Sequence, residues 1–129
     1  MADDIKRQTA YKCSIKDLNY GIFTKRPGWE SSYVMTEHGD FSRVNIIAVI
    51  VSKDGNSMTL DDGTGQIDAR VFDENIKIDN LDIGNIILTI ARPREYNNKI
   101  FLAVEMIKPL NNIGWINYRK KECRGENKN

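Results

Sequence analysis

The sequence predicts an all-β fold, a five-stranded antiparallel Greek-key barrel over residues 41–110. Short runs that are rich in β-branched residues, or that alternate apolar with polar residues, are separated by turn signals such as Asp54-Gly55 and Asp62-Gly63-Thr64-Gly65. Three such runs come in succession, an irregular stretch follows, and two more runs complete the set. No repeated helical pattern separates the runs, which argues against a parallel α/β sheet.

The expected strands cover 42–51, 58–60, 67–72, 86–90 and 99–107. Their alternation predicts a largely interior set: Val44, Ile46, Leu60, Ile67, Ala69, Val71, Leu88, Ile90, Leu102 and Val104. Between the third and fourth strands, residues 73–83 are weakly periodic, with acids in the first turn. We expect a short helix followed by a loop there; the alternative is an irregular plug.

Two further segments flank the barrel. We expect residues 1–40 to be an N-terminal extension that packs on the barrel, with Ser14 capping a short helical turn. The rings of Trp29 and Tyr33 either pack over one end of the barrel or meet a ligand beside neighbouring cations. Residues 111–129 are expected to form a short helix, capped by Asn111 or Asn112, and a basic tail.

Composition limits the classes of function. The 129 residues carry a net charge of only +1, so a site for a polyanion must be a local cluster of cations. One histidine and two cysteines are too few for a tetrahedral zinc set, and no triad or P-loop pattern appears. We therefore expect no enzyme, no metal and no cofactor. Two distant cysteines and the lack of an apolar signal or membrane segment predict a cytoplasmic protein.

Phe72 is the first candidate site residue. Ile67, Ala69 and Val71 share one face of the third expected strand, so Phe72 falls on the opposite face beside Asp68 and Arg70. An outward aromatic next to a cation is unusual and indicates a binding surface. The alternative is that Phe72 covers the side of the barrel or packs on the helix expected after it.

Three blocks of this sequence, in this order, resemble the middle subunit of replication protein A, of the archaeal type. The blocks are Cys13-Ser-Ile-Lys-Asp-Leu18, Leu60-Asp-Asp-Gly-Thr-Gly-Gln-Ile-Asp-Ala-Arg-Val-Phe72 and Gly84-Asn-Ile-Ile-Leu-Thr-Ile90. The insertion 23–36 is similar to one in archaeal members. The resemblance covers roughly residues 12 to 110 and implies an oligonucleotide/oligosaccharide-binding (OB) barrel that binds single-stranded DNA in replication, repair or recombination. An archaeal origin implies association with the nucleoid.

In that family two aromatic rings stack on the DNA, and motif order carries these roles to Phe72 and Tyr96. Tyr96 is expected in a polar loop between the fourth and fifth strands, where a simple turn role is the alternative. Nearby cations complete the predicted interface: Arg70, Arg92, Arg94 and Lys99. Arg43 and Lys53, on or near the first strand, either extend this interface or belong to a solvated edge.

The resemblance also implies partners. Family members assemble with other subunits through a C-terminal helix, often followed by a winged-helix domain; residues 111–129 supply at most the start of such a helix. Two other functions stay open. The chain is either an assembly module with little DNA binding of its own, or an RNA-binding barrel such as an anticodon-type domain.

Overall fold

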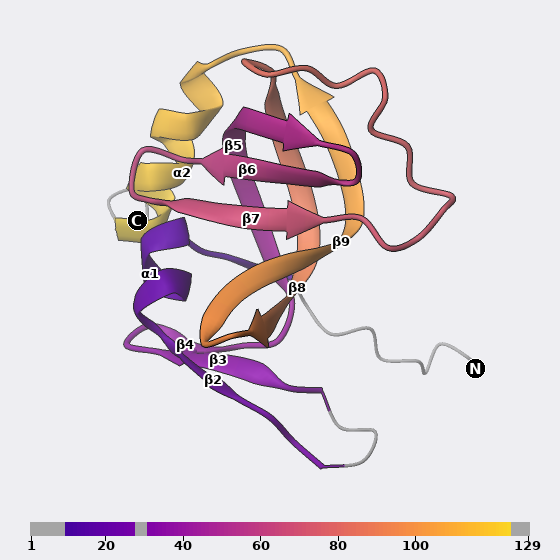
Figure 1. Ribbon diagram of the computed structural model, residues 1–129. Helices are drawn as coiled ribbons and strands as arrows, with labels where there is room; N and C mark the ends of the chain where they lie inside the picture. The colour runs from indigo at the N-terminus through magenta and orange to yellow at the C-terminus, as the bar shows by residue number, and fades with distance from the viewer. Residues whose placement is uncertain (1–9, 28–30, 125–129) are drawn as a thin grey trace, which may run out of the picture.

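A computed structural model describes residues 10–27 and 31–124, and five strands in this part of the chain close into a barrel (Figure 1). The barrel strands are β5 (Val44–Asp54), β6 (Ser57–Asp61), β7 (Gln66–Arg70), β8 (Ile86–Tyr96) and β9 (Lys99–Leu110). β5, β6 and β7 form an antiparallel meander, β8 and β9 form a hairpin, and β8 returns to pair with β5. The expected barrel is confirmed. The expectation of a wholly antiparallel sheet is wrong, because β7 pairs parallel with β9.

The interior of the barrel follows the predicted alternation on four strands and departs from it on β8. Eight of the ten residues expected inside are buried, and Leu88 and Ile90 are the exceptions. The core instead takes Ile87, Thr89 and Ala91, each 0 % exposed. Residues 86–90 are apolar at almost every position, so alternation could not decide which face points inward. The Thr89 hydroxyl is satisfied in the core because it donates to the Met106 carbonyl oxygen at 2.8 Å.

No helix forms between β7 and β8, so the expected helix at 73–83 is wrong. This connection is a series of turns, with Ile76 N–H donating to Asp73 O and Leu81 N–H donating to Ile78 O. The Asp73 carboxylate accepts from Asn75 N–H at 2.8 Å. Asp and Asn side chains that bond to nearby backbone groups compete with the helix, and this segment is rich in both.

The strands β8 and β9 are both longer than predicted. The fourth strand is expected to end at Ile90, yet β8 continues through Pro93 to Tyr96. β5 pairs with β8 only as far as Ala91, so Pro93 lies where β8 has become an edge strand and its missing N–H is tolerated. This extension of the hairpin beyond β5 carries several of the candidate residues.

The N-terminal segment contributes β1 (Tyr11–Lys12), α1 (Ile15–Tyr20) and a small sheet of β2 (Ile22–Thr24), β3 (Tyr33–Thr36) and β4 (Gly39–Phe41). Figure 1 shows α1 beside the barrel and the small sheet below it. Ile15, Leu18 and Val34 are fully buried in the same apolar cluster as the barrel interior. Trp29 lies outside the described residues, whereas the ring of Tyr33 lies under the Arg26 guanidinium, 4.4 Å from its carbon.

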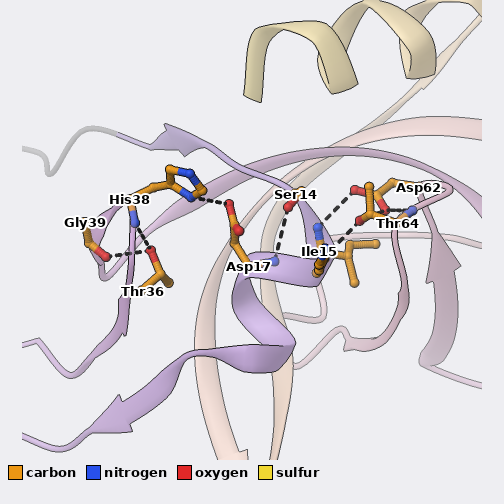
Figure 2. Close-up of polar contacts among 9 residues, drawn as sticks. Ser14, Ile15, Asp17, Thr36, His38, Gly39, Asp62 and Thr64 are labelled. Atoms are coloured by element: carbon orange, nitrogen blue, oxygen red, sulfur yellow. Dashed lines mark hydrogen bonds and ion pairs between the residues drawn. The ribbon is translucent and has the colours of Figure 1, made fainter. Parts of the chain in front are cut away.

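α1 begins at two side chains that satisfy its N-terminal N–H groups (Figure 2). Ser14 Oγ accepts from Asp17 N–H at 3.1 Å, as predicted. Asp62, only 3 % exposed, accepts from Ile15 N–H at 3.0 Å and from the N–H and hydroxyl of Thr64 at 2.9 and 2.6 Å. The turn between β6 and β7 therefore holds the start of α1 against the barrel.

The C-terminal helix α2 (Gly114–Arg124) confirms the predicted helix in this region. Asn112 Oδ1 accepts from Gly114 N–H at 2.7 Å, so Asn112 takes the capping role. Arg119 belongs to the expected basic tail, but it is only 4 % exposed and fastens α2 to β5 through the carbonyl and side-chain oxygens of Asn45.

We expect Asp62→Ala to lower the free energy of unfolding by about 1–3 kcal/mol, because it leaves buried N–H donors without an acceptor. Urea denaturation measures this change. Asp79→Ala, at an exposed position in the β7–β8 connection, is the matched control and should change stability by less than about 0.5 kcal/mol. Equal stability of the two variants would contradict the anchoring role of Asp62.

Candidate nucleic-acid interface

A groove of about 620 Å³ crosses the outside of the barrel where β8 and β9 meet the residues that follow β7 and those that precede β5. It collects four of the eight predicted site residues on one surface: Arg43, Phe72, Arg92 and Arg94. Asp73, Ala103, Val104 and Glu105 complete its lining. Residues that are up to 62 positions apart in the sequence thus share one concave site.

Strand alternation explains why these side chains point into the groove. On β8, Ala91 and Pro93 are buried, so Arg92 and Arg94 lie on the outer face. In the β8–β9 ladder Arg92 lies opposite Ala103 and Arg94 lies opposite Phe101. Because the Ala103 side chain is small, the surface is hollowed beside Arg92.

Phe72 lies two residues after the end of β7 and is 69 % exposed, while Val71 before it is buried. The prediction that Phe72 points away from the core is therefore confirmed. No helix follows Phe72 to cover it. Its ring lies 6.4 Å from that of Phe101, and the two planes are tilted by 59°.

Phe101 is a site residue that the sequence analysis missed. It is half-buried on β9, and the Arg70 guanidinium carbon lies 4.6 Å from the centre of its ring. Arg70, Phe101 and Phe72 thus form a row in which the Phe101 ring contacts a cation on one side and a second ring on the other. The alternation of the sequence could have identified it, because Ile100, Leu102 and Val104 alternate as core residues and leave Phe101 on the outer face with Lys99.

Tyr96 is the last residue of β8 rather than part of a loop, which corrects the expected position. The turn that follows is only Asn97-Asn98, whose φ angles of 54° and 63° are those of a tight hairpin turn. Tyr96 is 64 % exposed and shares the outer face with Arg92 and Arg94. Two residues of strand place it about 7 Å beyond Arg94, just outside the groove.

Lys99 lies opposite Tyr96 in the hairpin and is strongly exposed. Its ammonium is 3.6 Å from a carboxylate oxygen of Asp68 on β7. An exposed pair of this kind contributes little to stability, so Lys99 loses little if it turns towards another anion.

Glu105 links two of the predicted cations inside the groove. One carboxylate oxygen accepts from Arg43 Nε at 2.6 Å, and the other accepts from Arg92 Nε at 2.7 Å. Partial burial alone would raise the pKa of Glu105, but hydrogen bonds and charges from Arg43 and Arg92 outweigh it and hold that pKa below its usual value. Arg92 also reaches Ser31 Oγ at 3.5 Å, next to the small N-terminal sheet.

Lys53 does not lie in this groove. Its ammonium donates to the carbonyl oxygens of Ile78 and Leu81 at 2.7 Å each. These bonds hold the β7–β8 connection in place of the expected helix. We therefore leave Lys53 out of the proposed interface.

Groups with catalytic potential lie outside the groove. His38 and Asp17 form an exposed pair at 3.1 Å between the small sheet and α1 (Figure 2). Burial raises the pKa of the Cys123 thiol to about 11 and that of the Cys13 thiol still further, so both are protonated at neutral pH. Within residues 10–27 and 31–124, no cluster of His, Cys, Asp and Glu has the size to hold a metal ion, and no helix is long and apolar enough to cross a membrane.

The closed five-strand barrel, in which β8 returns to β5 and β7 pairs with β9, has the architecture of an OB fold. Solved structures of similar fold include replication protein A in two complexes: a heterotrimer bound to single-stranded DNA (13 % identity, TM-score 0.69) and yeast replication protein A bound to single-stranded DNA (19 %, 0.64). These matches cover 92 % of this chain and 95 % and 92 % of theirs. A chain of the S. pombe Stn1–Ten1 complex is also similar, with 11 % identity, a TM-score of 0.74 and coverage of 94 % of this chain and 93 % of that one.

At these identities the structural likenesses show the fold alone. No protein-family model matches the sequence, and no curated protein matches it either. The groove and the hairpin face are therefore the features that bear on function.

The exposure of Phe72 and Tyr96 predicts that neither ring is needed for folding. Phe72→Ala and Tyr96→Ala should each lower the free energy of unfolding by less than about 1 kcal/mol, because each ring is mostly in water. Ile67→Ala, at a buried position on β7, should cost about 2–5 kcal/mol in the same denaturation experiment. A comparable loss in Phe72→Ala would make that ring structural.

Proposed function

We propose that this chain is a non-catalytic single-stranded-DNA-binding protein, a subunit or fragment of a replication protein A-like complex of the archaeal, middle-subunit type. The observation that carries the proposal is the pair of exposed rings, Phe72 and Tyr96, on a face that also holds several cations. The motif resemblance points to the same two residues. Two structural neighbours are replication protein A chains in complexes with single-stranded DNA, which supports the proposal.

In this proposal unpaired bases stack on Phe72 and Tyr96, and Phe101 supports Phe72 from beneath. Stacking tolerates any sequence because every base has a π-face. Arg94 and Lys99 lie between and beside the two rings along the hairpin, where phosphates that connect the stacked bases would pass. Arg70 and the Arg43–Arg92 pair flank the other end of the path.

The near-neutral charge of the chain shapes the expected affinity. A net charge of +1 gives weak long-range attraction for a polyanion. The local cations supply some counterion release, but stacking has to provide a large share of the binding free energy. Loss of one ring should therefore be easy to detect.

We expect Phe72→Ala and Tyr96→Ala each to weaken binding of an oligo-dT of about 16 nucleotides by roughly 1–3 kcal/mol, or about five- to 150-fold. Fluorescence anisotropy at two salt concentrations measures the change. The matched control is Tyr20→Ala, which removes a ring that is 81 % exposed on α1, away from the groove. If all three variants bind like the parent, the rings are not binding platforms.

The same titration with oligo-rU tests the competing RNA function. Stacking on the two rings alone does not distinguish the two polymers, whereas a protein built for RNA uses the 2′-hydroxyl. Clear preference for oligo-rU would replace DNA by RNA as the ligand. Weaker binding of oligo-rU supports single-stranded DNA, and equal binding would show stacking without selection between the two polymers.

A second function, assembly with other replication protein A-type subunits, is favoured by the surface of α2. Ile113, Trp115 and Tyr118 are 68 %, 46 % and 47 % exposed. Trp115 and Tyr118 line a hollow of about 270 Å³ between α2 and the barrel, together with Ile47, Leu88 and Leu110. We propose that a partner subunit covers this apolar surface, in addition to DNA binding at the groove.

If α2 awaits a partner, its amides should exchange with solvent much faster than those of β5 in the isolated chain. The helix has only 11 residues and a largely polar composition, so it has little stability of its own away from the Arg119 anchor. Hydrogen exchange followed by NMR measures the ratio, with the β5 amides as the internal control. Protection of residues 114–121 equal to that of β5 would mean that the helix is complete without a partner.

A further inference from the structure

Glu105 is the feature of the groove that DNA binding leaves unexplained. It places a carboxylate at the centre of a surface that is proposed to bind an anion. Its two oxygens accept hydrogen bonds from two different arginines, Arg43 before β5 and Arg92 on β8, at 2.6 and 2.7 Å. A bare acid in such a site would repel phosphate, so its position needs a reason.

The arrangement matches the geometry by which arginine binds a phosphate. Guanidinium groups donate along fixed directions to paired oxygens, and carboxylate and phosphodiester oxygens are interchangeable as acceptors. Both arginine Nε–H groups converge on one carboxylate. The side chains of Arg43, Arg92 and Glu105 are 18 %, 32 % and 32 % exposed, so all three can be reached from the groove.

Phe72 lines the same groove, which places this cluster within reach of the phosphate next to a base stacked on its ring. A phosphate that bound beside an intact Glu105 would bring two negative charges close together in a partly buried site. Exchange of one acceptor for the other avoids that repulsion.

We propose that Arg43 and Arg92 form a clamp for one backbone phosphate and that Glu105 occupies the clamp in its place until DNA binds. This inference rests on the proposed function and deepens it. Glu105 keeps the two arginines aligned in the free protein, and it sets the affinity, because each binding event must break its two charge-assisted hydrogen bonds. Glu105 thereby also competes with other anions for Arg43 and Arg92. The net charge of +1 does not by itself distinguish single-stranded DNA from those anions.

Glu105→Gln keeps the size of the side chain and removes its charge. It therefore tests whether Glu105 competes with phosphate for Arg43 and Arg92 or only keeps these two side chains aligned. We expect Glu105→Gln to bind oligo-dT at least about fivefold more tightly than the parent, because phosphate no longer competes with a carboxylate. Its log–log salt dependence should steepen by about 0.7 for each additional phosphate that the variant neutralises. The control is Glu37→Gln, which changes the net charge equally at an exposed site beside α1.

Unchanged or weaker binding by Glu105→Gln, relative to Glu37→Gln, would overturn the exchange. That result together with a loss of affinity in Phe72→Ala would leave the proposed function standing and reject only the role of Glu105. Absence of binding by the parent and by every variant would reject both.

A second measurement on the unaltered chain does not depend on how any variant folds. The Nε–H signals of Arg43 and Arg92 in a ¹H–¹⁵N NMR spectrum report on the bonds to Glu105. Both should shift when oligo-dT is added, because their acceptor changes from carboxylate to phosphate. Signals that stay in place at saturating oligo-dT would show that Glu105 keeps the clamp and would overturn the proposal.

Discussion

The buried carboxylate of Asp62 is the interaction on which the arrangement of this domain depends. It accepts hydrogen bonds from the first helical N–H of α1 and from both donor groups of Thr64, so one side chain fixes a turn and a helix start together. A buried carboxylate is costly unless it is fully hydrogen-bonded, and here its position between two segments meets that condition. Thr64 Oγ1 also accepts from Lys16 N–H at 3.1 Å, which adds a second link between the same two segments.

This anchor determines how the rest of the chain can be used. Once α1 is held at the β6–β7 turn, Ile15 and Leu18 fill the apolar cluster of the barrel. The N-terminal segment is then part of the core, and Ser31, in the connection between β2 and β3, accepts a hydrogen bond from Arg92 of the groove. The hairpin of β8 and β9 extends past the last pairing with β5, which leaves this edge of β8 without a β5 partner. Most residues of the proposed interface are on this extension, at the end of β7 and just after it.

The sequence predicted the barrel, most of its interior, the Ser14 cap and the outward position of Phe72, because each depends on local alternation or on a turn signal. It failed where two local signals compete. Residues 86–90 carry apolar side chains on both faces, so the choice of Thr89 over Leu88 for the core depended on a hydrogen bond to β9. The helix expected at 73–83 does not form, because Asx turns and hydrogen bonds from the Lys53 ammonium stabilise the non-helical backbone of this segment. The Arg43–Glu105 contact joins residues 62 apart, and no local pattern contains it.

The cations of the proposed interface are mostly paired within the protein, and this has a consequence for selectivity. Arg43 and Arg92 bond to Glu105, Arg70 lies on Phe101, and Lys99 is near Asp68. A ligand that offers only phosphates must break these contacts and regains similar ones, so its net gain in free energy is small. Duplex DNA is such a ligand, because its bases are stacked on one another and cannot reach Phe72 or Tyr96. An unpaired strand adds stacking on two exposed rings to the same exchange of partners. On the proposed function, internal pairing of the cations therefore turns a general affinity for polyanions into a preference for single strands.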